Sequence, residues 1–107
     1  MAETVPYLYR LTLRSEMLGH PRSLAEQETL KRHLAYLTAA RDHGIVIAAG
    51  RTEASESATF GIVLFRAASE VEARSFMAND PAVAGKVMNA ELHPFRLAVP
   101  PKHWPPE

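Results

Sequence analysis

The pattern of apolar and polar residues predicts four strands. In the segment PYLYRLTLR the aromatic and leucine side chains alternate with a more polar set, so one face of this strand is apolar. Two further segments are short apolar runs rich in β-branched residues. The last segment contains Pro94, which has no N–H for a ladder bond and therefore indicates an edge strand. The predicted strands cover residues 7–14, 45–49, 59–66 and 87–99.

A first helix is predicted between the first two strands. Ser23 and Glu26 have the spacing of a capping box at its start. Leu30, Leu34 and Leu37 follow at i, i+4 and i+7, the spacing of one apolar stripe. Gly44 ends the helix just after His43, because glycine readily adopts the left-handed backbone that closes a helix.

A second helix is predicted after the third strand. Ser69 and Glu72 again have capping-box spacing, and the helix continues to about Asn79. Asp80 and Pro81 then match an N-cap followed by proline at the first helical position, which predicts a further short helical turn.

The predicted order β-α-β-β-α-β is that of a ferredoxin-like α+β domain. Right-handed crossovers give a four-stranded antiparallel sheet in the order 4-1-3-2, with two helices on one face. The third strand is nearly all apolar, so both of its faces require cover, and a second copy of the chain would supply the missing layer. We therefore expect a homodimer that pairs through the free face of the sheet.

The chain divides into one predicted domain and a short tail. Residues 1–99 form the domain, and residues 100–107 (PPKHWPPE) form an extended, proline-rich segment. Trp104 either anchors this tail on a partner subunit or lies exposed at a frayed end.

Composition narrows the classes of function. The chain has 12 basic and 12 acidic residues, so no charge excess predicts a nucleic-acid or membrane surface. It contains no cysteine, which excludes thiol nucleophiles and disulfides. No signal peptide or membrane-length apolar run is visible, and we expect a cytoplasmic protein.

Common catalytic and metal-binding motifs are missing from the sequence. It has no glycine-rich phosphate loop and no GxSxG segment. The five histidines never form HxH or HxxxH, the spacings that bring two imidazoles to one ion. We therefore predict no metal and no cofactor.

His33 and Asp80 are the candidate catalytic residues. His33 lies roughly 60° around the helix from the centre of the leucine stripe, at the rim of the predicted buried face. A histidine there could perform acid–base chemistry in a cleft, or simply make one hydrogen bond at the boundary of the core. Asp80 could orient an imidazole or act as a base, or it could only cap the helix that follows; the two roles are compatible because a carboxylate has two oxygens.

Four further residues are candidates for substrate binding. Arg10 and Arg14 share a face of the first strand and would suit an anionic substrate if that face lies inside the dimer. Tyr9 of the same strand and His93 of the last strand complete the set. His93 could instead be a surface residue of an edge strand.

Four segments together resemble the YciI-like, or YCII-related, protein family. They are PYLYRLTL, RHLAYLTAARDHGIVIAAG, FMANDPAVAGKV and ELHPFRLA, and they span nearly the whole chain in the family's order. The resemblance implies a dimeric α+β barrel and a His–Asp active site formed by His33 and Asp80. The loop of residues 51–58 is short beside some relatives, and the tail departs from the family pattern.

The resemblance also implies a class of reaction. Relatives with a known reaction are similar to lyases or dehydrochlorinases acting on hydroxylated aromatic rings, and muconolactone isomerases share the fold. We expect cofactor-free acid–base elimination or isomerisation of a small cyclic or phenolic substrate. The alternatives are a non-catalytic dimer that binds a small metabolite or another protein, and a cofactor-free monooxygenase.

Overall fold

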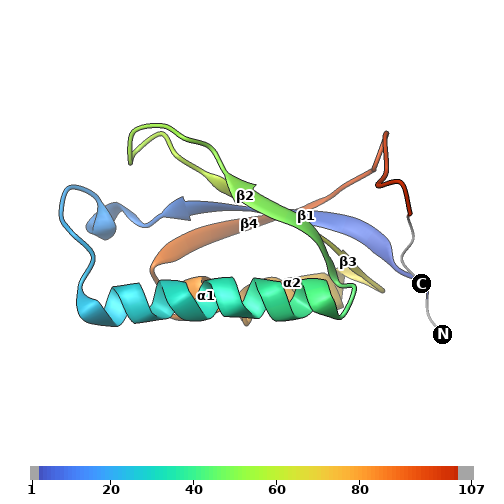
Figure 1. Cartoon of the computed structure of the whole chain (residues 1–107), viewed down its shortest axis with the longest axis horizontal. Helices are drawn as coiled ribbons and strands as arrows, with labels where there is room; N and C mark the ends of the chain where they lie inside the picture. Colours follow the sequence, from blue (N-terminus) through green and yellow to red (C-terminus); the bar gives the residue numbers. More distant parts are fainter. Residues whose placement is uncertain (1–2, 104–107) are drawn as a thin grey trace.

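A four-stranded antiparallel sheet with its helices on one face organises residues 3–103, which the computed structural model describes (Figure 1). The strand order is β2-β3-β1-β4, which confirms the predicted ferredoxin-like α+β fold and the predicted order. The elements in chain order are β1 (Val5–Leu13), the 3-10 helix η1 (Ser15–Met17), α1 (Leu24–Asp42), β2 (Val46–Arg51), β3 (Gly61–Ala67), α2 (Glu70–Ala78), α3 (Pro81–Ala84) and β4 (Met88–Pro94).

The register of the central strand β1 separates a core face from an open face. Tyr9 opposes Val63 on β3 and Leu92 on β4, and all three side chains are turned toward the helices. Arg10, the next residue, opposes Ile62 and is turned the other way. The core is built from the helix-facing side chains of the sheet and from those of the helices, namely Tyr7, Tyr9, Leu11, Leu37, Ala40, Val46, Val63, Phe65, Ala67 and Ala73.

Several strand ends differ from the prediction, and β1 ends at Leu13 instead of Arg14. Strand β2 continues through Arg51 instead of ending at Ala49, because Arg51 still pairs with Gly61. Strand β4 ends at Pro94, so the predicted continuation to residue 99 is wrong. Strand β4 lies at the edge of the sheet, as Pro94 predicted. Trp104 lies outside the described residues.

The caps of the two long helices are not equivalent. At α1, Ser23 Oγ accepts from Glu26 N, and Glu26 Oε1 accepts from Ser23 N, which confirms the capping box. At α2, Ser69 Oγ accepts from Glu72 N, but the Glu72 carboxylate accepts from Ala68 N instead. The backbone φ is −156° at Ser69 and −65° at Ser23, so the Ser69 amide is turned elsewhere and the second capping box is wrong.

Helix α1 is rotated relative to the predicted leucine stripe. Leu34 is 66% exposed, although the stripe placed it in the core. The buried positions are Leu37 and Ala40, with Tyr36 packed beside them. At about 100° per residue, these positions centre on the direction of His33. His33 therefore lies in the middle of the buried face and not at its rim.

The sheet face opposite the helices is open in the single chain. Ile62 is 38% exposed, and Leu64 of the same strand is half-buried. The Arg10 guanidinium lies 4.5 Å from the centre of the Phe60 ring and 3.7 Å from the Glu91 carboxylate. The chain alone thus covers β3 on one face, and the predicted second layer is not part of this structure.

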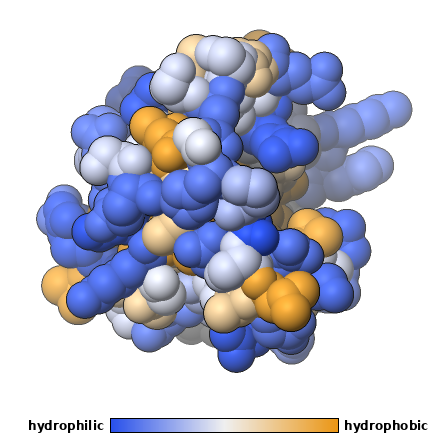
Figure 2. Space-filling model, turned by 90° about the vertical axis from the view of Figure 1, so that its left-hand side faces the viewer, coloured by the Kyte–Doolittle hydropathy of each residue, from blue (hydrophilic) through white to orange (hydrophobic). Residues whose placement is uncertain are grey.

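Polar groups dominate the end of the molecule where α1 begins. The loop before α1 and the β2–β3 connection lie at this end, whose surface is mostly hydrophilic with scattered hydrophobic side chains (Figure 2). No helix within residues 3–103 is both long and apolar enough to cross a bilayer.

A close approach between α3 and α1 depends on Gly85. A Cβ atom at this position would lie 2.8 Å from the Pro81 carbonyl oxygen and 3.0 Å from Thr29 Cγ2 on α1. A Cβ at Gly50 would meet nothing within 4 Å. Glycine at position 85 therefore lets α3 pack tightly against α1.

We expect Gly85→Ala to lower the free energy of unfolding by about 1–3 kcal/mol, because the added methyl group overpacks this contact. Gly50→Ala is the matched control and should not destabilise the protein. Urea unfolding followed by circular dichroism measures both. Equal stabilities of the two variants would contradict the tight packing of α3.

Candidate active site

A buried carboxylate joins three elements of the fold. Asp80 is the N-cap of α3 and is fully buried. Its Oδ1 accepts from the Ala82 backbone N–H at 2.9 Å and lies 2.6 Å from His33 Nδ1 of α1. Its Oδ2 accepts from the Tyr9 hydroxyl of β1 at 2.7 Å. Asp80 therefore caps a helix and holds an imidazole with the same side chain.

Three hydrogen-bonding groups surround the buried Asp80 carboxylate. Burying a charge is costly unless it is paired and hydrogen-bonded, and three donors satisfy that requirement here. Burial, followed by the nearby Asp80 charge and their hydrogen bond, raises the pKa of Tyr9 above its ordinary value. Tyr9 thus stays protonated at physiological pH and donates to Asp80.

Tyr36 supports the same region from α1. Its hydroxyl donates to the Phe76 carbonyl at 2.7 Å, and its ring stacks on Phe76 with a centroid separation of 5.0 Å. Burial and the Asp80 charge raise the pKa of Tyr36 to about 12. Two polar side chains of α1, His33 and Tyr36, therefore find partners beneath the helix.

The hydrogen-bond network assigns the tautomer of His33. An ionised carboxylate can only accept, so the proton of a neutral imidazole lies on Nδ1. Nε2 then carries the free lone pair, and it has no hydrogen-bond partner among residues 3–103. Nε2 is also accessible, because the buried side-chain nitrogens and oxygens without a partner do not include it. His33 can therefore accept a proton from a bound molecule at Nε2.

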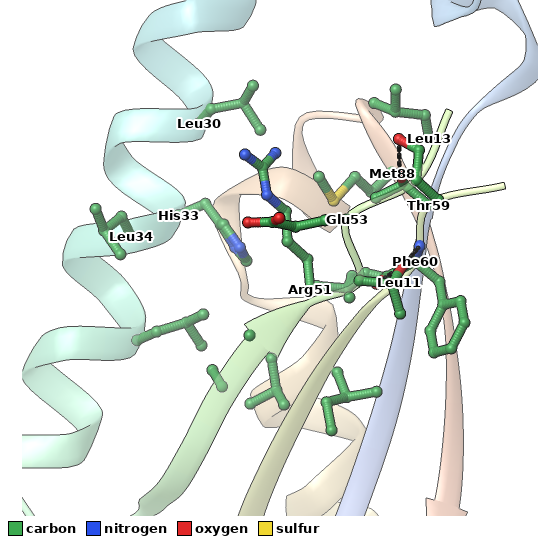
Figure 3. A pocket seen from close by; sticks show the side chains of 18 of the residues that line it. Leu11, Leu13, Leu30, His33, Leu34, Arg51, Glu53, Thr59, Phe60 and Met88 are labelled. Carbon is green, nitrogen blue, oxygen red and sulfur yellow. Dashed lines mark hydrogen bonds between the residues drawn. The ribbon is translucent and has the colours of Figure 1, made fainter. Parts of the chain in front are cut away.

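His33 forms part of the wall of a pocket of about 900 Å³ between α1 and the sheet (Figure 3). Most of the wall is apolar, which suits a small ring-shaped molecule. Tyr9 and Asp80 do not reach the pocket and act on it only through His33. The large apolar side chains that line it on the helix side of the sheet are Leu11, Leu13, Leu30, Leu34, Leu37, Val63 and Met88.

Two charged residues of this pocket were missed from the sequence. Arg51 and Glu53 point into the same space as His33 (Figure 3). Arg51 ends β2 and pairs with Gly61, on the face that Ala49 and Val63 share. Extending the alternation of the second strand by two residues would have placed Arg51 on the helix side of the sheet.

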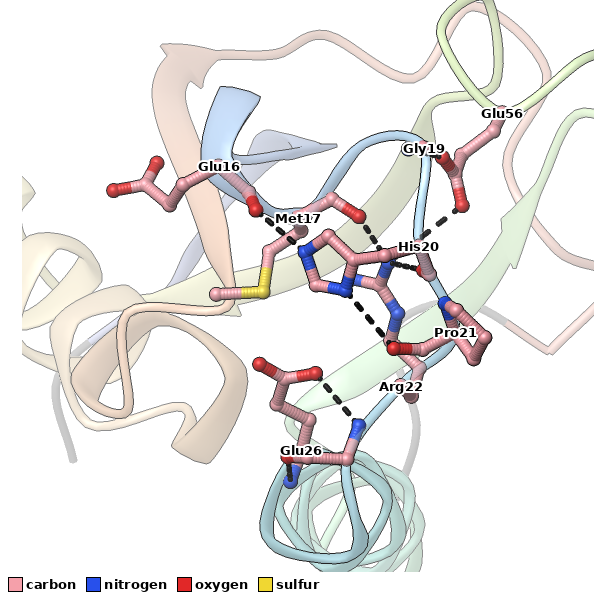
Figure 4. A network of polar contacts seen from close by, with 9 residues as sticks. Glu16, Met17, Gly19, His20, Pro21, Arg22, Glu26 and Glu56 are labelled. Atoms are coloured by element: carbon pink, nitrogen blue, oxygen red, sulfur yellow. Dashed lines mark hydrogen bonds and ion pairs between the residues drawn. The ribbon is translucent and has the colours of Figure 1, made fainter.

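A polar network ties the loop before α1 to the β2–β3 connection (Figure 4). Glu56 accepts from the Gly19 backbone N–H at 2.8 Å and lies 3.7 Å from Arg22 Nη2. Arg22 Nη2 also donates to the carbonyls of Met17 and His20. Because Arg22 and Glu56 line the pocket, this network holds its mouth together.

Arg22 also carries the one buried side-chain nitrogen without a partner within residues 3–103, its Nη1. Its other terminal nitrogen, Nη2, is the one that donates to the Met17 and His20 carbonyls. Arg22 therefore braces the mouth of the pocket.

His20 holds the same loop through both ring nitrogens. Its Nε2 lies 2.7 Å from the Glu16 carbonyl and its Nδ1 lies 3.0 Å from the Pro21 carbonyl. A neutral imidazole has one N–H, so only the protonated ring can donate to both. These carbonyl contacts raise the pKa of His20, that to Glu16 more than that to Pro21.

None of the predicted substrate-binding residues lines this pocket. Tyr9 is buried against Asp80, and Arg14 lies beyond the end of β1, paired with Glu16. Arg10 and His93 lie on the open face of the sheet, beside Glu91 and Leu8 respectively in the strand register. A substrate-binding role for these four residues stays a prediction.

Within residues 3–103, no three histidine, aspartate or glutamate side chains gather closely enough to hold a metal ion. The described contacts hold His33 through Nδ1 and leave its Nε2 able to accept a hydrogen bond or a proton.

Comparison with known proteins gives a family and a fold. The sequence profile of the YCII-related domain matches residues 16–96. No curated protein sequence matches the chain. The structure is similar to 5-chloro-2-hydroxyhydroquinone dehydrochlorinase from Burkholderia phenoliruptrix AC1100, in complex with 2,5-dihydroxybenzoquinone: 19% identity, TM-score 0.66, covering 86% of this chain and 94% of that one.

An uncharacterized protein from Thermotoga maritima is also similar, at 6% identity and a TM-score of 0.51, covering 88% of this chain and 100% of that one. Both likenesses establish the α+β fold.

We expect Tyr9→Phe to lower the free energy of unfolding by about 1–3 kcal/mol, because Asp80 Oδ2 would lose its donor inside the core. Tyr7→Phe is the control: Tyr7 lies on the same face of β1, and its hydroxyl has no partner in the described chain. It should change stability by a few tenths of a kcal/mol at most. Chemical denaturation measures both, and equal effects would contradict the role of the Tyr9 hydroxyl.

Proposed function

Because the chain belongs to the YCII-related domain family, we propose that it is a cofactor-independent enzyme that performs elimination or isomerisation on a small cyclic or phenolic substrate. The observation that carries this proposal is the 2.6 Å contact between His33 Nδ1 and the buried Asp80 carboxylate. It leaves Nε2 of a pocket residue free to exchange a proton.

His33 is the acid–base residue of the proposed reaction. Nε2 accepts a proton from a C–H or O–H group of the substrate, and the released electron pair forms a new π bond. In an elimination, the leaving group departs with its bonding electrons. In an isomerisation, the imidazolium returns the proton to a different atom of the substrate.

Asp80 stabilises the imidazolium that forms during this step. Its negative charge lies beside Nδ1, and the Tyr9 hydroxyl and Ala82 N–H fix the direction of the carboxylate. A preorganised charge of this kind needs no reorganisation when the proton moves. Asp80 and Tyr9 are therefore positioning residues, since neither touches the pocket.

The dehydrochlorinase with the similar fold supports an elimination, because its name describes the removal of hydrogen and chlorine from a hydroxylated aromatic ring. The apolar wall of this pocket suits a ring of that kind. A halogenated or hydroxylated aromatic compound is therefore the first substrate class to test.

The proposed enzyme is a homodimer formed through the open face of the sheet. Leu8, Ile62 and Leu64 give this face an apolar centre, with Arg10 and Glu91 beside it. A second copy would bury these side chains and supply the layer that a half-covered sheet lacks. Arg10 and His93 would then face the dimer interior.

We expect His33→Gln to lower kcat by about 10²–10⁴-fold on a hydroxylated aromatic substrate, because the proton acceptor is lost. Asp80→Asn should also lower kcat, since a neutral amide stabilises the imidazolium poorly. The control His43→Gln changes the C-cap of the same helix, outside the pocket. Loss of substrate is followed by chromatography with a panel of chlorinated and hydroxylated aromatic compounds.

A folded His33→Gln protein with full activity would refute the assigned role of His33. A compound that binds and returns unchanged after prolonged incubation would favour a binding module over an enzyme. Circular dichroism establishes that each variant is folded.

We expect sedimentation at micromolar concentration to give the mass of two chains, and Leu64→Glu to give the mass of one, because a charge would be buried at the interface. Val71→Glu is the control: Val71 is 80% exposed on α2, on the other side of the sheet. A wild-type mass of one chain would contradict the dimer.

A further inference from the structure

Arg51 contributes an uncommitted positive charge to the pocket. The residue ends β2 on the helix-facing side of the sheet, and its side chain points into the same space as His33 (Figure 3). No described residue gives Arg51 a hydrogen bond or an ion pair. Arg22, the other arginine of the pocket, is engaged by two backbone carbonyls and by Glu56.

We propose that the substrate carries an oxyanion, a carboxylate or an ionised phenol, and that Arg51 is the residue that binds it. This inference rests on the proposed function for the identity of the reacting group but concerns binding alone. A planar guanidinium matches the two oxygens of a carboxylate and also accepts a single phenolate oxygen.

The arrangement of the walls gives this charge a role in orientation. His33 lies on α1 and Arg51 on β2, so the two side chains enter the pocket from facing walls. Between them the lining is apolar, with Leu11, Leu37 and Val63 among its members. An aromatic ring whose oxyanion contacts Arg51 can pack on these side chains and turn another of its atoms toward His33 Nε2.

The Glu53 carboxylate repels an anion in the pocket. Removing its charge should therefore strengthen anion binding, whereas removing the charge of Arg51 should weaken it. Its carboxylate points into the same space (Figure 3) and has no partner among residues 3–103. Glu56 differs, because Gly19 and Arg22 already occupy it. Glu53 therefore repels a bound oxyanion and competes with it for Arg51.

The experiment measures binding of benzoate and of its neutral counterpart benzamide to the full chain by calorimetry and by NMR shift changes. We expect benzoate to bind more tightly than benzamide and to shift the resonances of residues lining the pocket. Arg51→Gln should weaken benzoate binding roughly fivefold, a moderate effect because the residue is exposed. Glu53→Gln should strengthen it about twofold to fivefold, and neither variant should change benzamide binding.

Arg32→Gln is the matched control, because Arg32 is exposed on α1 and does not line the pocket. If Arg32→Gln and Arg51→Gln weaken benzoate binding equally, the effect comes from the net charge of the protein and the proposal is overturned. Undetectable benzoate binding, or benzoate binding no tighter than benzamide, would also overturn it.

A parallel titration with 4-nitrophenolate separates the two oxyanions. If Arg51→Gln weakens the binding of benzoate but not of 4-nitrophenolate, the site binds carboxylates. If it weakens the binding of 4-nitrophenolate but not of benzoate, the site binds phenolates. None of these results depends on turnover, so failure of the Arg51 site leaves the kinetic test of His33 unaffected, and the reverse also holds.

Discussion

The buried carboxylate of Asp80 is the constraint on which the rest of the structure depends. A charge removed from water must be paired and hydrogen-bonded, and removing one partner of such a pair costs on the order of 3–5 kcal/mol. The donors come from β1, α1 and the first turn of α3, so this requirement fixes three elements relative to one another. The tight contact at Gly85 brings α3 close enough to α1 for the arrangement.

The orientation of α1 follows from the same requirement. For His33 to reach Asp80, the helix must turn His33 toward the sheet, and Tyr36 then reaches the Phe76 carbonyl. Leu34 is about 100° around the helix from His33 and is carried to the exposed side. A pattern count treats every leucine as core and every histidine as boundary, so it placed the buried face in the wrong direction. The polar partners of His33 and Tyr36 lie 47 and 40 residues away in sequence.

Sequence reasoning succeeded where local rules determine the structure. Strand order follows from the alternation of elements and from right-handed crossovers, and the Ser23 cap and the edge position of Pro94 follow from single residues. It failed where the result depends on how far along the chain two strands remain paired. Arg51 enters the pocket only because β2 runs beyond Gly50, and Arg14 leaves the sheet because β1 ends at Leu13. Arg51 still pairs with Gly61 although Gly50, a residue type common in turns, precedes it.

The molecule separates the proposed chemistry from the selection of a substrate. Asp80 and Tyr9 are sealed in the core, so a change in either alters the stability of the fold as well as the direction of the imidazole. Arg51, Glu53 and the loops joined by Glu56 lie at the exposed end of the pocket and carry little of the packing. Substitutions there can alter the charge and shape of the mouth without disturbing the His33–Asp80 pair. A fold built in this way can keep one proton-transfer step while the ligand that reaches it varies.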